Sequence, residues 1–509
     1  MTQAIADLLD SLSERGVRVR MENEHLVFQC SRGAVLPGEL DELRRRKNEI
    51  TALLKHRALE IESSIRPREN YFRTPLLEVQ TNVFNEMKKL RIERNARFCT
   101  VGVRVLGELN TRLLERSIAA VVQRHDSLRT RIIELDGVPE QHIDTTCDFD
   151  FEIVECCKHS NADSEHDLRL SAEAFADEEI SLSVGPLFAA RLFRVSNGEH
   201  VLVLLLDHMI ADGVSLSILS RDVWTSYRQV VHDAPFSLPH LPIQLPDYAV
   251  WQKNTRAAWF RDHGAYWRER LGGAPRMQLP FDNCAAVSAD QRGAILEVDF
   301  GNSLSVRLRD MALREKTLPA LLMLSIYIAV MSRWCSQRDL VVTFVENGRW
   351  CPELENVIGW LSNHLHLRIE VGQDVSCVDL IKQVHLEFCS AHDHQDFHRV
   401  PQMIAEYSMG LYFNWLSTSC DQWRLNQLLL PSEEIQLQPF EVTRREKWLF
   451  EFGTFFSEAG SRIAATLLYR ADLFERSTIE RFGRNLRSFA EELIRQPSGN
   501  VASVPLEMC

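Results

Sequence analysis

The chain has 509 residues, of which 45% are hydrophobic and 25% are charged, and its formal net charge is −13. This composition is typical of a globular protein and excludes a disordered or fibrous chain. The length exceeds what one compact core organises, so two or more structural units are expected. The acidic balance argues against nucleic acid or an anionic membrane as the main partner.

The lack of a recognisable targeting signal and the spacing of the cysteines predict a cytoplasmic protein. The first residues lack the basic and apolar segments of a secretory signal peptide. The apolar run 318–331 is shorter than the ~20 residues of a membrane span and contains Pro319 and Ser325, so we expect a buried helix there. The 12 cysteines are scattered without a CxxC pair, which favours reduced thiols over a zinc site or a disulfide framework.

Residues 1–57 are predicted to form a small module of the order αββαα. A short amphipathic helix is expected over 4–12 and a β-hairpin over 17–28, where apolar and basic residues alternate around a polar turn. Apolar residues at helical spacing predict helical structure over 39–55. The polar stretch 58–70 is interpreted as a linker.

Strands and helices alternate through the rest of the chain, which predicts an α/β (α+β) fold with an N-lobe over 71–240 and a C-lobe over 241–509. Helices are expected at 111–123 and 214–231. Strands are expected at 201–206 and 338–344. The run 201–206 is wholly aliphatic, which is typical of a strand buried on both faces.

The end of that aliphatic strand carries the residues with the clearest chemical potential. Asp207 and His208 follow it, and Asp212 and Gly213 come four and five residues after the histidine. This spacing holds one imidazole at the edge of a core, where proton transfer is useful.

The segment from His208 to Gly213 resembles the HHxxxDG motif of condensation domains of non-ribosomal peptide synthetases, which are relatives of chloramphenicol acetyltransferase. Four further segments resemble motifs of that family in the same order, and the resemblance covers 71–509. They are RHDSLRT at 124–130, LPDYAVW at 245–251, IGWLSN at 358–363 with Arg368 beyond it, and HQDF at 394–397. The resemblance implies two chloramphenicol-acetyltransferase-like lobes that form a V with a central tunnel.

The resemblance also implies a reaction and its partners. An amine on one carrier protein attacks the thioester carbonyl of an acyl group on another, and the phosphopantetheine arms of both carriers enter the tunnel. No bound cofactor is implied. His208 would accept the proton of the amine or hold the amine and the tetrahedral intermediate by hydrogen bonds. The N–H of Gly213 is a candidate donor to the oxyanion.

By the same resemblance, Asp212 is a structural residue that pairs with an arginine and holds the loop of His208 in place. Arg129 is the first candidate for that partner and Arg349 the second. Asn363 is expected either to form hydrogen bonds within the tunnel or to cap a local turn. The histidines at 392–398 lack a third ligand at helical spacing, so no metal site is predicted.

Asp207 departs from the family pattern, in which a histidine usually stands there. If the two side chains are close, its carboxylate favours the imidazolium form of His208 and weakens the base. Asp207, Asp212 and Ser215 also satisfy the DxxxxDxxS pattern of heterocyclisation domains. Ordinary condensation domains commonly carry that serine, so only Asp207 discriminates, while His208, Gly213 and Asn363 favour condensation.

Residues 1–57 are similar to small docking domains that receive the C-terminal peptide of an upstream synthetase subunit as an added strand. Arg18 and Arg20 beside the hairpin edge would favour an extended, acidic peptide. The alternative is a solvated basic strand in an appended module that has no partner.

Other functions remain open at this stage. A soluble acyl-CoA-dependent transferase would carry a DFGWG segment, which we do not find, and a degenerate recruitment domain would not need His208. Placement of a docking module at the N-terminus argues against an epimerisation domain. Adenylation, carrier and thioesterase motifs are not found, and the chain is either a stand-alone protein or part of a larger subunit. Substrate identity, donor stereochemistry and the choice between amide and ester also stay open.

Overall fold

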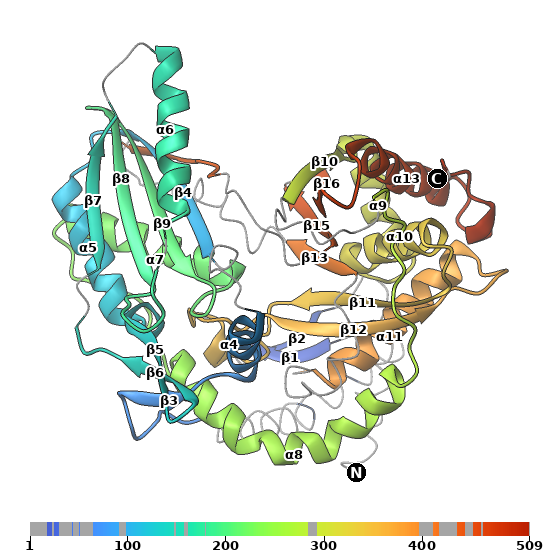
Figure 1. The fold of residues 1–509 in the computed structure, drawn as a ribbon, viewed down its shortest axis with the longest axis horizontal. Coiled ribbons are helices and arrows are strands. Elements are labelled where there is room, and N and C mark those ends of the chain that lie inside the picture. The colour runs from blue at the N-terminus through green and yellow to red at the C-terminus, as the bar shows by residue number, and fades with distance from the viewer. Residues whose placement is uncertain are drawn as a thin grey trace.

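The structure is a computed structural model in which two lobes form a V (Figure 1). Helix α8 (Leu245–Leu271) crosses the base of the V from one lobe to the other. The structure describes residues 18–22, 25–29, 43, 50, 65–90, 98–146, 149–156, 161–178, 180–283, 293–395, 411–416, 435–442, 451–459 and 462–507.

A five-stranded sheet in the order β14-β4-β9-β8-β7 forms the centre of the N-lobe. Helices α5 and α7 cover one face of this sheet and α6 covers the other (Figure 1). The elements are β4 (Phe98–Gly107), α5 (Thr111–Arg124), β7 (Asp150–Glu155), α6 (Asn161–Ala176), β8 (Phe188–Ser196), β9 (Glu199–Asp207), α7 (Gly213–Val231) and β14 (Ile435–Pro439).

Strand β9 confirms the expectation of a strand buried on both faces. Leu202, Leu204 and Leu206 pack into the core beneath α5 and α7. The alternate residues Val201 and Val203 pack into the core beneath α6. Successive side chains of a strand point to opposite faces, so the aliphatic run serves both cores at once.

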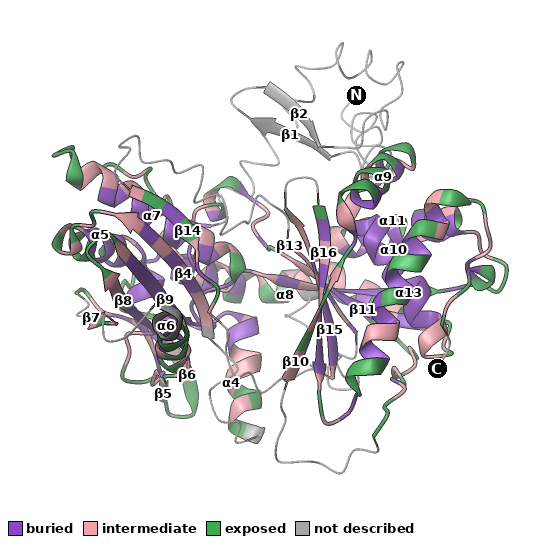
Figure 2. Cartoon of the chain, turned by 90° about the horizontal axis from the view of Figure 1, so that it is seen from above, coloured by how far each residue is buried: buried purple, intermediate pink, exposed green. Residues whose placement is uncertain are grey.

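A six-stranded sheet in the order β10-β16-β15-β13-β11-β12 forms the C-lobe. Its helices lie on one face, and α10 is the most buried of them (Figure 2): every residue from Ala320 to Ser332 is buried, as expected for the apolar run. The elements are β10 (Gly293–Asp299), α9 (Gly301–Arg314), α10 (Pro319–Trp334), β11 (Asp339–Glu346), β12 (Asn363–Glu370), α11 (Cys377–Asp393), β13 (Tyr412–Leu416), β15 (Phe452–Ala459), β16 (Arg462–Arg470) and α13 (Arg476–Arg495).

Smaller elements complete the two lobes. A three-stranded sheet in the order β3-β6-β5 lies below the large N-lobe sheet, beside one end of α8 (Figure 1). The strands of this sheet are β3 (Arg73–Pro75), β5 (Thr130–Leu135) and β6 (Val138–Ile143). The other small elements are α4 (Glu78–Leu90) and the short 3-10 helices η2 (Asp126–Arg129), η3 (Pro352–Leu354) and η7 (Val501–Ser503).

The structure differs from the expected lobe boundary at 240/241 in one place. Strand β14 comes from the second half of the chain but pairs with β4 in the N-lobe sheet. The N–H of Phe440 then donates to Gly102 O at 3.0 Å. A Cβ at Gly102 would lie 2.2 Å from Phe440 O, so only glycine permits this approach. A pairing between such distant segments has no local sequence signal.

The last residues of the segment 58–70, which was expected to be a linker, are part of the folded structure. Ile65 and Arg68 are buried, with relative exposures of only 6%, so this segment packs into the lobes. In the module before it, β1 (Arg18–Glu22) and β2 (His25–Gln29) pair antiparallel, which confirms the predicted hairpin. The side chains of Arg18 and Arg20, the helix expected over 4–12 and most of 39–55 lie outside the described residues.

No single helix in the described ranges is long and apolar enough to span a membrane. Helices α9 and α10 meet that criterion only as a pair, and their axes are bent by 103°.

Candidate active site

His208 projects from the tight turn that follows β9. The next three residues, Met209, Ile210 and Ala211, are fully buried in the N-lobe core and anchor the turn. Buried Gln80 holds it from the other side, because its Nε2 donates to Met209 O at 2.5 Å. His208 itself is half-buried, so the turn presents one imidazole outside a fixed core.

The imidazole of His208 packs against the indole of Trp360, with 4.2 Å between the ring centroids. Trp360 comes from the loop before β12, so this contact joins the turn of the N-lobe to the C-lobe half of the chain. Nδ1 of His208 is buried and has no hydrogen-bond partner among the described residues. A buried polar atom without a partner is costly, so this nitrogen is suited to a bond with a ligand.

Asp212 caps helix α7 and binds the C-lobe at the same time. Its Oδ1 accepts from the N–H of Ser215 at 2.9 Å. Arg349 approaches both carboxylate oxygens, at 3.0 Å each. The N–H groups of Leu361 and Ser362 donate to Oδ2, also at 3.0 Å. Burial alone would raise the pKa of Asp212, but Arg349 and these donors outweigh it and hold the pKa below its usual range.

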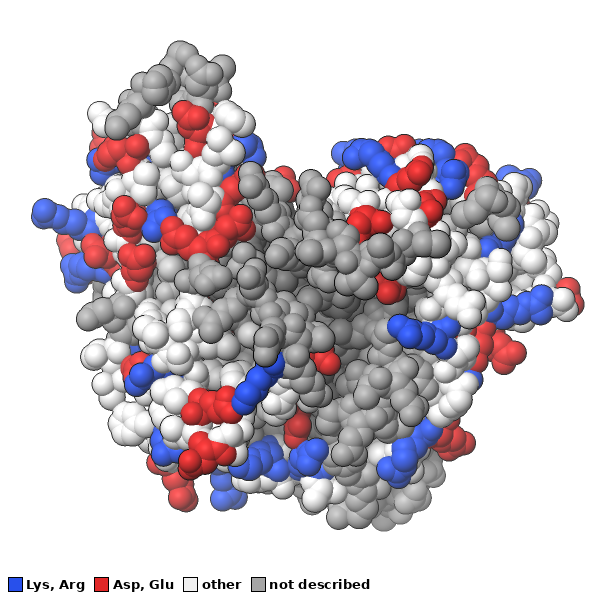
Figure 3. Space-filling model, viewed as in Figure 1, with Lys and Arg blue, Asp and Glu red and all other residues white. Residues whose placement is uncertain are grey.

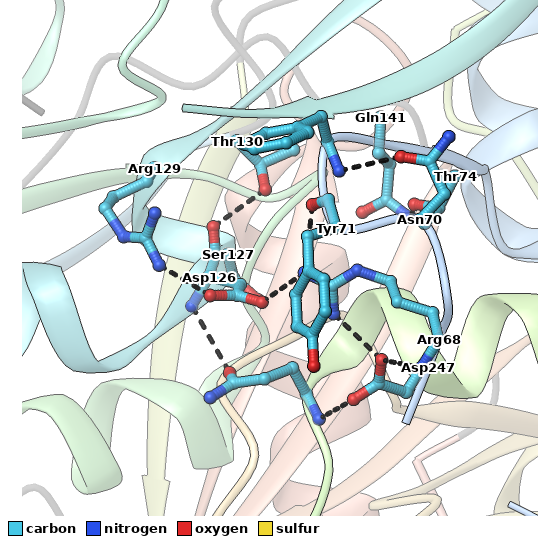
Figure 4. Close-up of polar contacts among 12 residues, drawn as sticks. Arg68, Asn70, Tyr71, Thr74, Asp126, Ser127, Arg129, Thr130, Gln141 and Asp247 are labelled. Atoms are coloured by element: carbon cyan, nitrogen blue, oxygen red, sulfur yellow. Dashed lines mark hydrogen bonds and ion pairs between the residues drawn. The ribbon is translucent and has the colours of Figure 1, made fainter. Parts of the chain in front are cut away.

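Arg349, the second candidate, is therefore the partner of Asp212, and the preference for Arg129 was wrong. Arg129 instead donates to Asp126 at 2.6 Å. Asp126 also binds Arg68, which reaches Asp247 at the start of α8 (Figure 4). Arg129 lies only three residues from Asp126, so the nearer carboxylate takes it.

Two glycines permit the loop of Arg349 to approach Asp212. Gly348 has φ +65°, and a Cβ there would lie 1.7 Å from Leu361 O. A Cβ at Gly359 would lie 2.3 Å from the side chain of Leu245 in α8. The hydroxyl of Ser215 accepts from the N–H of Gly359 at 3.0 Å and lies 2.8 Å from Asp212 Oδ1. Ser215 thus belongs to the packing between the lobes.

The carboxylate of Asp207 is turned back onto its own chain. It is fully buried, and its Oδ1 accepts from the N–H of Met209 at 2.9 Å. This bond stabilises the turn that carries His208. Asp207 therefore has a local structural role that needs no ionic contact with the imidazole.

Gly213 is the first residue of α7 and is exposed. Its φ is not positive, and a Cβ added there would meet nothing within 4 Å. Neither backbone conformation nor packing in the described structure requires glycine here, so the open space beside it is available to a bound molecule.

Asn363 makes a local contact, and its expected hydrogen bonds within the tunnel stay a prediction. Its Oδ1 accepts from the N–H of His364 at 2.9 Å, which is a local bond, and the side chain lines a cavity at the base of the V. Burial, with a smaller contribution from His208, lowers the pKa of His364 to about 4. Burial and His364 together lower the pKa of His366 to about 3. Two neutral imidazoles thus line the sheet near His208.

The histidines after α11 make other contacts. His392 lies 2.9 Å from Glu346, and His394 stacks on Tyr266 with centroids 3.8 Å apart. His398 and Asp396 lie outside the described residues. Within the described ranges, no group of three or more histidine, cysteine or acidic side chains is arranged to hold a metal ion.

Family comparison agrees with this geometry. The family profile described as Condensation domain matches residues 73–507. The chain belongs to the condensation domain family. A second profile, the TubC N-terminal docking domain, matches residues 5–56, ahead of the condensation domain.

Curated relatives of this condensation domain are synthetases. Isonitrile lipopeptide synthase of Mycobacterium tuberculosis is 29% identical over 424 residues, which are 79% of this chain and 17% of that protein. Phosphinothricin tripeptide synthetase PhsC of Streptomyces viridochromogenes is 29% identical over 440 residues, which are 84% of this chain and 39% of that protein. The chain thus spans less than half the length of these relatives.

Solved structures share the fold of this condensation domain. The X-domain from teicoplanin biosynthesis superposes with a TM-score of 0.76 at 20% identity and covers 87% of this chain and 100% of its own. The EpoB NRPS cyclization-docking bidomain from Sorangium cellulosum superposes with a TM-score of 0.74 at 19% identity. This match covers 96% of this chain and 98% of the bidomain. The expected two-lobed fold is confirmed.

Sequence reasoning missed several residues of this condensation domain. Trp360 lay within a recognised motif, yet its contact with His208 joins segments that are distant in the chain. His364 and His366 alternate with leucines, a period-2 pattern that places both imidazoles on the face of β12 opposite the helices. That alternation was the available signal. Gln80 and Arg68 had no such signal, because their partners are far away in the sequence.

Substituting Arg349 with alanine leaves Asp212 charged and buried without its guanidinium partner. We expect Arg349→Ala to lower the free energy of unfolding by about 3–5 kcal/mol, measured by urea denaturation. Arg476→Ala removes an ion pair whose arginine side chain is 67% exposed and should change stability little. Equal effects of the two substitutions would contradict the assigned role of Arg349.

The lowered pKa values of His364 and His366 predict acid sensitivity. Their imidazoles take up protons near pH 6.5 in the unfolded chain, but at about 4 and 3 when folded. The unfolded state thus binds more protons below pH 6.5, and the free energy of unfolding decreases as pH falls from there towards 4. The double substitution His364→Asn, His366→Asn should reduce this slope, whereas the exposed control His166→Asn should not. An unchanged slope in the double variant would show that these histidines titrate normally.

Proposed function

We propose that this condensation domain joins two substrates carried on the phosphopantetheine arms of donor and acceptor carrier proteins. The position of His208 carries this proposal. A half-buried imidazole stands where the two lobes meet, on a turn held by a buried core and by the Asp212–Arg349 pair. Such a fixed base suits proton transfer between groups that are brought to it.

The proposed reaction is acyl transfer. The amine of the acceptor attacks the thioester carbonyl of the donor, a C–N bond forms, and the C–S bond breaks to release the phosphopantetheine thiol. His208 takes the proton that the amine loses, or holds the amine and the tetrahedral intermediate by hydrogen bonds. A hydroxyl acceptor would give an ester by the same steps. Proximity of two tethered substrates supplies a further part of the acceleration.

Gly213 is the proposed oxyanion donor. The first N–H groups of a helix have no intrahelical acceptor, and Gly213 is the first residue of α7. The space beside it admits a carbonyl close to the backbone. A developing negative charge at this helix end is also favoured by the helix dipole.

The partners follow from the reaction. Two carrier proteins deliver their arms into a tunnel between the lobes from opposite faces, and the chain itself needs no bound cofactor. We expect a cytoplasmic location, because the scattered cysteines without a CxxC pair favour reduced thiols. On the face shown in Figure 3, the described Lys and Arg side chains are interspersed with Asp and Glu, which gives nucleic acid little to bind.

For the N-terminal module, we propose docking to an upstream synthetase subunit. The hairpin of β1 and β2 is a two-stranded sheet in the described structure, and such a sheet offers its edge to an extended peptide. Arg18 and Arg20 stand on β1 and would favour an acidic peptide.

Heterocyclisation, the alternative that Asp207 raised through the DxxxxDxxS pattern, is not favoured, because the Asp207 carboxylate accepts from the N–H of Met209 within its own turn. Asp212 and Ser215 satisfy the same pattern, but both are engaged in packing the lobes together. The two activities differ in their products, because cyclisation removes one further water from the simple amide.

Loss of the His208 imidazole is expected to slow product formation by about 10²–10⁴-fold while the protein stays folded. The assay loads donor and acceptor carriers and follows the product by mass spectrometry for the parent, His208→Ala and Asp207→His. The exposed control His232→Ala should retain full activity. A folded and fully active His208→Ala protein would exclude the catalytic role, and a product lighter by one further water would move the assignment to heterocyclisation.

Deletion of residues 1–57 is expected to weaken binding of the upstream subunit, since the added strand loses its template. Activity on carriers supplied at high concentration should not change. Charge reversal of Arg18 and Arg20 should weaken binding in the full-length chain as well. Binding that survives the deletion unchanged would end the docking assignment.

A further inference from the structure

A cavity of about 210 Å³ lies between α8, the loop that carries Arg349, and the end of α11. Six of the 15 described residues that line it are aromatic, and these include four of the chain's 10 tryptophans. The six aromatic lining residues are Tyr248, Trp251, Trp259, His263, Trp350 and Trp360.

Contacts among the rings hold the walls of the cavity in place. Tyr248 and Trp251 stack with centroids 5.3 Å apart, and Trp251 packs against Trp350 at 5.5 Å. The indole N–H of Trp350 donates to the hydroxyl of Tyr248 at 3.4 Å. That of Trp259 donates to Gln395 O at 2.9 Å. Rings fixed in this way form a binding surface without further loss of conformational freedom.

Trp360 connects this cavity to the active site. The same indole that lines the cavity packs on His208 with 4.2 Å between centroids. Its Nε1 is buried and has no hydrogen-bond partner in the described part of the chain. A group inside the cavity therefore touches the residue that packs on the imidazole of His208.

We propose that this cavity binds the aromatic side chain of an aminoacyl group carried by one of the two tethered substrates; this substrate assignment rests on the proposed condensation activity. Flat indole and phenol faces interact best with another ring, offset or edge-on. Aliphatic groups gain only burial from such walls. The polar residues Ser362, Asn363 and Gln395 also line the cavity, and they suit a phenol or indole that carries one polar atom.

A cationic side chain is the main alternative occupant, because aromatic cages also bind cations. Among the described residues that line this cavity, the acidic one is Asp393, and it is exposed. A carboxylate in water attracts a cation weakly. The aromatic occupant is therefore favoured, and the cation becomes an outcome of the test.

Ligand-observed NMR titration of the full-length protein tests the cavity without catalysis. The probes are p-cresol, the saturated analogue 4-methylcyclohexanol, and choline. We expect p-cresol to bind roughly five- to tenfold more tightly than 4-methylcyclohexanol. Equal affinities, tighter binding of choline, or no binding of p-cresol would each overturn the proposal.

Variants locate the bound probe. Trp350→Leu should weaken p-cresol binding by roughly tenfold, whereas Trp350→Phe should retain most of it. Trp415→Leu is the matched control, since Trp415 packs against Phe456 in the C-lobe and does not line the cavity. Urea denaturation checks that each variant is folded. If p-cresol binding survives in folded Trp350→Leu and Trp360→Leu, the probe binds elsewhere and the proposal fails.

A condensation assay then separates the two proposals. Rates of product formation are compared for aromatic and aliphatic aminoacyl groups, first at the donor and then at the acceptor position. At one of the two positions the aromatic group should react faster, and Trp350→Leu should abolish this preference. Equal rates at both positions would overturn the substrate assignment while condensation stands. A different result would be that no pair gives product, while p-cresol still binds and Trp350→Leu still weakens that binding. This result would overturn the proposed function, but the aromatic binding site would stand.

Discussion

The buried pair of Asp212 and Arg349 is the contact on which the candidate active site depends. Asp212 is the N-cap of α7, the helix that follows His208, and Arg349 comes from the loop between β11 and β12. The pair therefore joins the two lobes beside the imidazole. Burying these charges is tolerable because bidentate contact and several N–H donors compensate them. The position of His208 is thus a consequence of lobe packing.

At the base of the V, a second group of buried arginine and aspartate side chains also joins segments that are distant in the chain. Arg68 reaches Asp126 in the 3-10 helix after α5 and Asp247 at the start of α8, and Arg129 completes the group (Figure 4). These acids belong to two segments that resemble family motifs. Much of what identifies the family in the sequence therefore holds the lobes together.

Local periodicity explains which expectations the structure confirmed. The strand over 201–206, the helix over 214–231 and the buried helix over 318–331 each carried a period-2, helical or continuous apolar pattern, and each formed. The partner of Asp212 had no such signal, because 137 residues separate it from Arg349. Arg129 stood in a motif of the right family but next to a nearer carboxylate, and proximity in the chain decided its pairing.

The sequence by itself determined the family, the order of most elements and the turn that carries His208, since all three depend on short patterns and motifs. Only the tertiary structure decided that Arg349 binds Asp212, that β14 crosses to the N-lobe sheet, and that Trp360 packs on His208 beside an aromatic cavity. Those contacts form between segments that meet only when both lobes are packed. Their geometry depends on the whole fold, which no local spacing encodes.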